Sequence, residues 1–369
     1  MKSLNIRYIP AVDHLRGFAA LLIFFYHGFA LIGYQLEYGE PFSFTHWNVA
    51  SNPFSALLIE GHTAVSLFMV LSGFIFTIGS YQSQVRYSDF VRNRFLRTYP
   101  LFVLLLIAGV SSHTDQFSFT GFAQTLLFMG NLPGTVNAGA FSSMVWVVAV
   151  EWQFYLVFPL IILFVNRYGI KYLLGLIAVF IILRCFASLM GANIRDLSYW
   201  TIIGRMDQFL VGIGAGVIYR LRFQAGARFD FLFLASGVFV LTLMYIFNHM
   251  GGWPAESQFK IIWPTIEGIA WAGLVLGYIS VARWAPERLS SLLIALGTIS
   301  YSVYLIHFIV IDICIQNGFV FSLHGLSSGQ NALLVALVIL PVVLLISTLT
   351  YHCVEKPFLQ LRHTYIEKR

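Results

Sequence analysis

The sequence predicts an all-α, polytopic membrane protein with about ten transmembrane helices, and two observations lead to this fold class. Of the 369 residues, 58% are hydrophobic and only 10% are charged, whereas roughly 25% of the residues of an ordinary soluble domain are charged. The apolar residues also gather in separate stretches of about 17 to 25 residues, the length that a helix needs to cross a bilayer. Most of these stretches lack the charged face that a helix on a soluble core presents.

The apolar stretches define the expected helices and one long loop. We expect helices at approximately 14 to 36, 60 to 80, 97 to 112, 144 to 165, 172 to 190, 199 to 219, 229 to 249, 261 to 282, 292 to 316 and 331 to 353. A single membrane domain, residues 1–369, accounts for the chain, with its longest outer loop at about 112–143. This loop fits a cap over an outward cavity and, equally, a passive connector.

The positions of Lys and Arg predict the orientation in the membrane. With the N-terminus in the cytoplasm, eighteen of the 22 Lys and Arg residues fall at cytoplasmic segments and three, Arg195, Arg205 and Lys260, at outer segments. The positive-inside rule therefore predicts that the N- and C-termini are cytoplasmic and that the protein lies in the inner (plasma) membrane. Since topology accounts for the net charge of +6, we expect the lipid bilayer, and no nucleic acid, as its surroundings.

The first helix carries two ionisable residues on one face. Arg16 and His27 are eleven residues apart, which corresponds to three full turns plus ~20° and to an axial separation of ~16 Å. If Arg16 lies near the cytoplasmic surface, His27 lies close to the midplane of the bilayer. An arginine at a helix entrance also extends readily to lipid headgroups, so Arg16 alone is ambiguous. A midplane histidine is costly and by default indicates a functional site or a buried polar pair.

Glu151, in the stretch VEWQFY, is the second intramembrane group. A helix that enters from outside near Met144 places Glu151 ~10 Å below the outer surface, within side-chain reach of His27. A carboxylate bonded to one ring nitrogen of a histidine fixes the tautomer and makes the other nitrogen more basic. We therefore expect His27 to act as a general base oriented by Glu151. The alternative is a structural hydrogen bond between helices.

Arginines form a third group, at the cytoplasmic entrance of the third helix. The stretch VRNRFLRTYPL contains Arg92, Arg94 and Arg97, and the last two share one helix face. The guanidinium group is well suited to phosphate, so the cluster fits a phosphorylated cytoplasmic ligand. It equally fits topology and lipid headgroups. The three cysteines show no metal-ligand spacing, and we expect no metal.

Further polar residues fall inside the expected helices. Ser300, Tyr304 and His307 lie on one face of the ninth helix, a stripe that suits either helix packing or a cavity wall. Four buried charges have no partner that the sequence assigns: Arg184, Asp207, Glu267 and Asp312. The simplest expectation is that Asp207 or Asp312 neutralises Arg184.

Six motifs in a fixed order resemble the acyltransferase-3 family of integral membrane acyltransferases. They are LRGFAALLIFFYH with Arg16 and His27, FMVLSGF, RFLRTYP, VEWQFYLVFP, LGTISYSVYLIHF and YHCVEKPF. The resemblance runs almost from end to end. The sequence departs from the family at Ser66, where many members carry Asp, and at Val148 and Ala149, where others have Leu-Ser. We expect no counterpart of the fused C-terminal esterase-like domain that some members carry.

The resemblance implies transfer of an acyl group, most simply acetyl, from cytoplasmic acyl-CoA to a hydroxyl. The implied acceptor is a cell-surface carbohydrate or lipid-linked glycan, such as lipopolysaccharide O-antigen or exopolysaccharide, and within the family also a macrolide or peptidoglycan. The catalytic residues are then His27, Glu151 and Arg16, and Arg94 and Arg97 bind the donor. Direct transfer and an acyl-enzyme on Ser72 both fit.

The alternative from another class is a proton-coupled transporter or flippase, in which His27 and Glu151 form a proton relay. The absence of evident inverted repeats and of Gly/Pro-broken helix pairs counts against a transporter.

Overall fold

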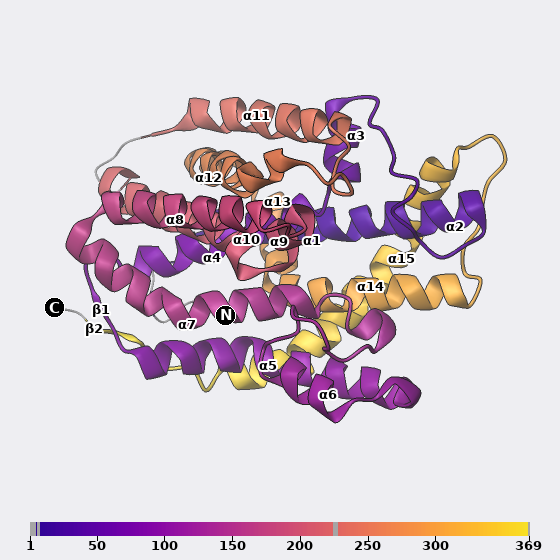
Figure 1. Ribbon diagram of the computed structural model, residues 1–369, viewed down its shortest axis with the longest axis horizontal. Helices are drawn as coiled ribbons and strands as arrows, with labels where there is room; N and C mark the ends of the chain where they lie inside the picture. The colour runs from indigo at the N-terminus through magenta and orange to yellow at the C-terminus, as the bar shows by residue number, and fades with distance from the viewer. Residues whose placement is uncertain (1–4, 6–7, 224–227, 368–369) are drawn as a thin grey trace.

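The computed structural model describes residues 5, 8–223 and 228–367 and shows a bundle of helices with two very short strands (Figure 1). Within these residues, nine helical segments are long and apolar enough to cross a membrane. In chain order they are built on α1 with α2 (Pro10–His27 and Gly33–Tyr38), α4 (Thr63–Ser80), α5 (Tyr87–Ser112), α7 (Val145–Tyr168), α8 (Ile170–Leu189), α10 (Ile202–Ile218), α11 (Asp230–His249), α12 (Trp263–Val281) and α15 (Ser328–Thr350). The predicted all-α polytopic class is confirmed.

The remaining elements are shorter. The other α-helices are α3 (Pro53–Ile59), α6 (Phe119–Leu126), α9 (Ile194–Trp200), α13 (Glu287–Thr298), α14 (Ser300–Gln316) and α16 (Lys356–Leu359). Three π-helical turns extend spanning helices: η1 (Gly28–Ile32), η4 (Tyr219–Phe223) and η7 (Tyr351–Glu355). The 3₁₀ turns are η2 (Thr114–Gln116), η3 (Gly139–Phe141), η5 (Gln258–Ile261) and η6 (Ala282–Trp284). The strands β1 (Gln84–Val85) and β2 (Ile366–Glu367) pair antiparallel, with Gln84 opposite Glu367.

The expected ninth helix, 292 to 316, is wrong as one straight helix. It begins earlier, at Glu287, and is broken into α13 and α14, which meet at an angle of 69°. Hydroxyl groups bond to backbone carbonyls at the break: the Thr298 hydroxyl donates to the Ile294 carbonyl, and the Ser300 hydroxyl donates to the Gly297 carbonyl. Such side-chain bonds compete with the helical ladder. The bend lays α13 against α1 and directs α14 along the outer part of α1.

Two other boundaries differ from the sequence prediction. The third helix begins at Tyr87, ten residues before the predicted start, because the helix continues inward past its apolar stretch. Arg94 and Arg97 therefore stand on a continuous helix. The outer loop at 112–143 contains the helix α6, and Phe128 in it stacks on Trp152 of α7 at 4.0 Å between ring centroids. None of its residues lines the inner cavity or the outer cavity described in the next section.

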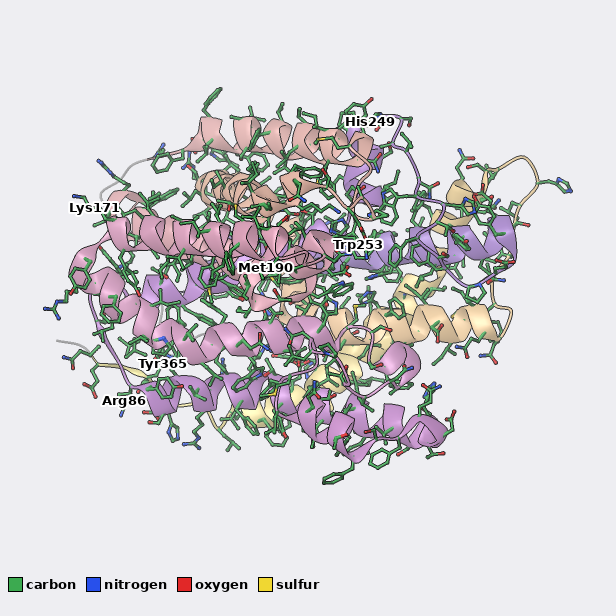
Figure 2. The ribbon with its side chains drawn as sticks, in the orientation of Figure 1. Arg86, Lys171, Met190, His249, Trp253 and Tyr365 are labelled. Carbon is green, nitrogen blue, oxygen red and sulfur yellow. The ribbon has the colours of Figure 1, made fainter. Side chains whose placement is uncertain are left out.

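The two ends of the described chain meet at one side of the bundle. The backbone amide of Tyr365 donates to the side chain of Asn5, and the amide of Arg86 donates to the Tyr365 carbonyl at 2.9 Å. Figure 2 shows Arg86, Tyr365 and Lys171 toward the same end of the molecule, with Trp253 farther toward the other end. We call the end with Arg86 and Lys171 the inner face. Four of the charges counted in the prediction lie outside the described residues: Lys2, Arg7, Lys368 and Arg369.

Helices α4 and α10 cross in backbone contact at the centre of the bundle. A Cβ atom on Gly73 would lie 2.2 Å from the Phe209 carbonyl oxygen, and one on Gly212 would lie 2.2 Å from the Val70 carbonyl oxygen. Only glycine fits at both positions. Small residues at helix interfaces allow this approach inside a membrane, where packing rather than water drives association.

A buried ion pair joins α8 to α10. The Arg184 guanidinium donates to both carboxylate oxygens of Asp207, at 2.5 and 3.2 Å, and also to the Ile261 and Ile203 carbonyls. Both side chains are fully buried. The expected neutralisation of Arg184 is thus confirmed for Asp207, whereas Asp312 accepts a bond from Gln316.

The close crossing of α4 and α10 predicts that a larger side chain at Gly73 strongly lowers the stability of the fold. In Gly73→Leu the side chain overlaps the opposing backbone, so we expect the melting temperature in detergent to fall by several degrees, because overpacking costs about 1–3 kcal/mol or more. Gly175→Leu is the matched control, since Gly175 also lies within a spanning helix but a Cβ there meets nothing within 4 Å. Equal melting temperatures for the two variants would contradict the crossing.

Candidate active site

An inner cavity of about 520 Å³ opens at the inner face and runs into the bundle. Its lining begins at Tyr8 and Arg362, near the two ends of the described chain, and reaches Phe68 on α4 and Tyr304 on α14. The bend between α13 and α14 contributes to its wall, because Ile294, Thr298 and the first turn of α14 all line it. A volume of this size is typical of pockets for small molecules and cofactors.

Four of the five site residues predicted from sequence line this inner cavity. They come from three helices far apart in sequence: Arg16 on α1, Arg94 and Arg97 on α5, and Glu151 on α7. The structure therefore brings these four together, and it adds a fourth arginine, Arg362. Of the predicted residues, only His27 stands outside the lining.

Each arginine of the inner cavity has a different environment. Arg16 lies 3.7 Å from Asp13. The guanidinium of Arg97 lies 3.1 Å from a carboxylate oxygen of Glu355, which is fully buried. Arg94 lies 4.8 Å above the ring of Phe76, and its Nε has no hydrogen-bond partner among the described residues. None of these contacts, nor the bond from Arg362 to the Leu359 carbonyl, is a bidentate pair with a carboxylate, so the four arginines keep donors with which to bind an anion.

Positive charge is concentrated at the mouth of the inner cavity. Burial, followed by the neighbouring charges of Arg94 and Arg97, lowers the pKa of Arg362 to about 10. A lowered arginine pKa means that the charged form is held at a cost. A ligand with negative charge at this mouth removes that cost, so the electrostatics favour an anionic ligand.

Glu151 does not pair with His27, and this expectation is corrected. Its two carboxylate oxygens accept bonds from the hydroxyl groups of Ser72, at 3.2 Å, and Tyr155, at 2.8 Å. Both donors line the inner cavity with Glu151. The predicted height in the membrane was not enough, because α7 turns this carboxylate toward the inner cavity and its arginines rather than toward His27.

His27 pairs instead with His307, in a dyad between α1 and α14. The Nδ1 atom of His27 lies 2.9 Å from the Nε2 atom of His307, and the Nδ1 atom of His307 lies 2.9 Å from the Val303 carbonyl oxygen. A carbonyl only accepts, so Nδ1 of His307 carries a proton and its Nε2 accepts when the ring is neutral. His27 therefore donates from Nδ1, and its Nε2 holds the free lone pair.

An outer cavity of about 560 Å³ begins beyond His27 along the first spanning segment, and neither His27 nor His307 is among the residues that line it or the inner cavity. It starts at Phe29 and Ala30, directly after His27 on the same helix, and opens among α3, the start of α15 and the loop that follows α2. Its wall is rich in aromatic rings: Phe29, Tyr34, Tyr38, Phe42 and Trp47. Its charged side chain is Glu37, and neither Lys nor Arg occurs in the lining that the structure describes.

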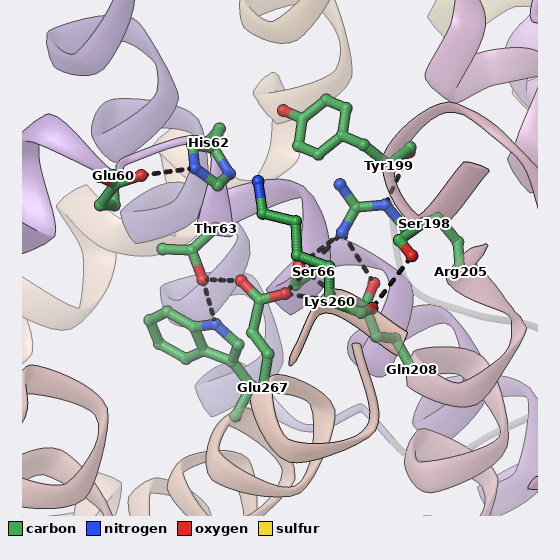
Figure 3. A network of polar contacts seen from close by, with 11 residues as sticks. Glu60, His62, Thr63, Ser66, Ser198, Tyr199, Arg205, Gln208, Lys260 and Glu267 are labelled. Atoms are coloured by element: carbon green, nitrogen blue, oxygen red, sulfur yellow. Dashed lines mark hydrogen bonds and ion pairs between the residues drawn. The ribbon is translucent and has the colours of Figure 1, made fainter. Parts of the chain in front are cut away.

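A third polar group, the outer polar network, joins α4, α10 and α12 (Figure 3). Glu267 accepts from Thr63 at 2.5 Å and from Gln208 at 2.9 Å, and Arg205 lies 3.8 Å from the same carboxylate. Arg205 also donates to Ser66, where many family members carry Asp. In this chain Glu267 supplies the opposing charge instead. The network neutralises buried charges and is structural in form.

The comparisons with known proteins identify the family of this chain. A family model described as an acyltransferase domain matches residues 9–352, and the chain belongs to the acyltransferase-3 family. It is 26% identical to the acyltransferase MdmB of Streptomyces mycarofaciens, over 96% of this chain and 92% of that protein. The protein is thus an acyltransferase built on a multi-pass membrane bundle. No solved structure is significantly similar to it.

Two further relatives are longer proteins. The chain is 24% identical to a putative O-acetyltransferase of Staphylococcus aureus (strain COL) and to the putative peptidoglycan O-acetyltransferase YrhL of Bacillus subtilis (strain 168). The alignments cover 97% and 96% of this chain but 58% and 56% of the relatives. The chain therefore spans little more than half the length of these two proteins.

Besides Arg362, two site residues are not predicted as such by the sequence pattern. The pattern places His307 on a polar stripe without a partner, and it does not assign Glu355, in YHCVEKPF, to Arg97. The sequence does mark both residues, because each lies within one of the six motifs that resemble motifs of the family. What the sequence could not supply was the pairing, because the residues in each pair are more than 250 positions apart.

Proposed function

We propose that this protein is an O-acyltransferase that moves an acyl group, most simply acetyl, from acyl-CoA at the inner face to a hydroxyl of a carbohydrate at the outer face. The observation that carries the proposal is the height of His27 along the first spanning segment, between Arg16, which lines the inner cavity, and Phe29, which lines an outer cavity of opposite character. The inner cavity is basic, and the outer cavity is aromatic and without Lys or Arg in its described lining.

The inner cavity suits a coenzyme A thioester. Coenzyme A carries several phosphates, and guanidinium groups bind phosphate with paired, charge-assisted hydrogen bonds. Arg94, Arg97 and Arg362 at the mouth would bind this anionic part, and the acyl end would then extend toward Tyr304, where the cavity ends. Arg16, partly paired with Asp13, is the fourth cation of this lining.

The outer cavity suits a sugar. Aromatic rings present apolar faces for the faces of sugar rings, while Ser55, Gln330 and Glu37 supply polar edges. The described lining offers neither Lys nor Arg to a phosphate or carboxylate, so an uncharged sugar unit of a cell-surface or lipid-linked glycan fits best. Peptidoglycan, named for one relative, and a macrolide are the alternatives within the family.

In the proposed reaction, Nε2 of His27 takes the proton of the acceptor hydroxyl while the oxygen attacks the thioester carbonyl. The carbon–oxygen bond forms, the carbon–sulfur bond breaks, and the proton passes to the leaving thiolate, so that coenzyme A is released as the thiol. His307 positions His27 because its Nε2 accepts a hydrogen bond from the Nδ1–H group of His27. Glu151 balances the charges of the arginines and does not act on His27.

Two alternatives have less support. An acyl-enzyme on Ser72 would use Glu151 as its base, but Tyr155 shares this carboxylate, and direct transfer needs no intermediate. A proton-coupled transporter or flippase would use His27 and Glu151 as one relay, whereas each has a different partner here. The family to which the chain belongs also favours the enzyme.

The dyad gives the first prediction for this function. His27→Ala should abolish transfer of radiolabel from acetyl-CoA in membranes at normal protein abundance. His307→Ala should lower kcat by at least ~10-fold, because the ring of His27 loses its fixed tautomer and general base catalysis contributes ~100-fold or more. His307→Gln should recover part of this loss, since its side-chain carbonyl can accept the same bond. Normal transfer by His27→Ala would refute the role of the dyad.

Charge reversal in the inner cavity should weaken donor binding. We expect Arg94→Glu to raise the KM for acetyl-CoA by ~10-fold or more, because one lost charge-assisted contact of ~1.4 kcal/mol corresponds to a factor of ten. Arg167→Glu is the matched control: it makes the same charge change at the inner end of α7, outside the cavity lining. An equal KM for the two variants would remove the donor assignment.

The outer cavity should govern the acceptor and not the donor. In Tyr38→Ala and Phe42→Ala we expect ~10-fold less label in the glycan fraction at limiting acceptor, with an unchanged KM for acetyl-CoA, because each loses a ring that contacts the sugar. Phe54→Ala is the control, since Phe54 is 73% exposed on the same side but lines neither cavity. Mass spectrometry of the labelled glycan identifies the acylated unit, and label on a uronic acid or sugar phosphate would contradict an uncharged acceptor.

A further inference from the structure

The hydroxyl of Tyr304 is buried without a hydrogen-bond partner among the residues that the structure describes. The side chain is only 5% exposed. Leaving a buried hydroxyl unpaired costs about 1–3 kcal/mol, so such groups are rare and call for a physical reason. A phenylalanine at this position would pack as well and would avoid the cost.

The position of this hydroxyl is informative. Tyr304 lines the deep end of the inner cavity, the end away from the arginines of the mouth. It lies three residues before His307 on α14, and the two ring centroids are 6.0 Å apart. The ring of Phe68 packs against it edge to face at 6.2 Å. Tyr304 therefore stands in the wall of the inner cavity close to the dyad, and its hydroxyl oxygen is both buried and unpaired among the described residues.

Other polar groups of the cavity are already engaged. Tyr301 lies three residues before Tyr304 on α14, and its hydroxyl donates to the Thr98 carbonyl at 2.7 Å. The hydroxyl of Tyr155 donates to Glu151 at 2.8 Å. Tyr304 thus differs from the other tyrosines on helices α14 and α7 that line the cavity, because its proton is not used by the protein.

We infer that Tyr304 is a further catalytic residue, whose hydroxyl donates a hydrogen bond to the thioester carbonyl oxygen of the donor. This inference rests on the proposed function. As the acceptor oxygen attacks the carbonyl carbon, the carbonyl oxygen becomes an oxyanion, and a donor already aimed at it stabilises the charge without reorganisation. The phenol keeps its proton throughout, while the hydroxyl proton of the acceptor passes through His27 to the leaving thiolate. The orphan hydroxyl of the empty cavity is then the group that the substrate satisfies.

The decisive variant is Tyr304→Phe, which removes one oxygen atom and keeps the ring. We expect the rate of label transfer from saturating acetyl-CoA to fall by ~100-fold, the loss typical of one oxyanion donor. The KM for acetyl-CoA and the affinity for free coenzyme A, measured by calorimetry, should change less than twofold. The melting temperature without ligand should stay equal or rise, because an unpaired buried hydroxyl is removed.

A matched control and a graded variant separate this role from a structural one. Tyr172→Phe makes the same change on α8, away from both cavities, and should leave transfer unchanged. Site-specific 3-fluorotyrosine at position 304 keeps the donor and strengthens it, so transfer should remain at least near the wild-type rate. A Tyr304→Phe rate equal to wild type, or a fluorotyrosine variant as slow as Tyr304→Phe, would overturn the inference.

The experiment also distinguishes failure of the role of Tyr304 from failure of the proposed function on which this role rests. If wild-type membranes transfer no label from acetyl-CoA to any membrane component, the proposed function fails, and the role of Tyr304 fails with it. If wild type transfers label and Tyr304→Phe does so at the same rate, the function stands and only the role of Tyr304 is rejected.

Discussion

A charge inside a bilayer must be paired or must face a water-filled cavity, and this constraint organises the whole protein. Where the charges are structural, the pairing is complete: Arg184 meets Asp207 with two bonds, and Glu267 accepts from Thr63 and Gln208. Where the pairing is loose, as at Arg94, a cavity is present. Fully paired charges therefore belong to the framework of the bundle, whereas loosely paired charges belong to the candidate site.

The same constraint explains why the bundle is bent and closely crossed. Two cavities can approach one histidine pair only if the helices between them leave space on one side and pack tightly on the other. The break between α13 and α14 forms a wall of the inner cavity, and the contact of α4 with α10 at Gly73 and Gly212 closes the opposite side. Backbone geometry at a few positions thus positions α14, and with it Tyr304 and His307, against α1.

The histidine pair shows how a polar group in an apolar interior gains a defined state. One carbonyl, that of Val303, determines which nitrogen of His307 is protonated, and His307 then determines the tautomer of His27. A chain of two hydrogen bonds fixes the lone pair of Nε2. No charge is needed for this orientation, which suits a site deep in the membrane, where a carboxylate would be costly.

The sequence by itself determined the class of the protein and four of the residues that line the inner cavity. Apolar length and sparse charge predict spanning helices, and the spacing of Arg16 and His27 predicts a shared face, because both depend on helix geometry alone. Tertiary structure decided the partners: His307 rather than Glu151 beside His27, Glu355 beside Arg97, and the bend at residue 299. The spacing of residues along one helix determines their heights along the helix axis and the face on which their side chains lie. Which side chains meet depends on the rotation and tilt of the neighbouring helices, which packing contacts set across the whole chain.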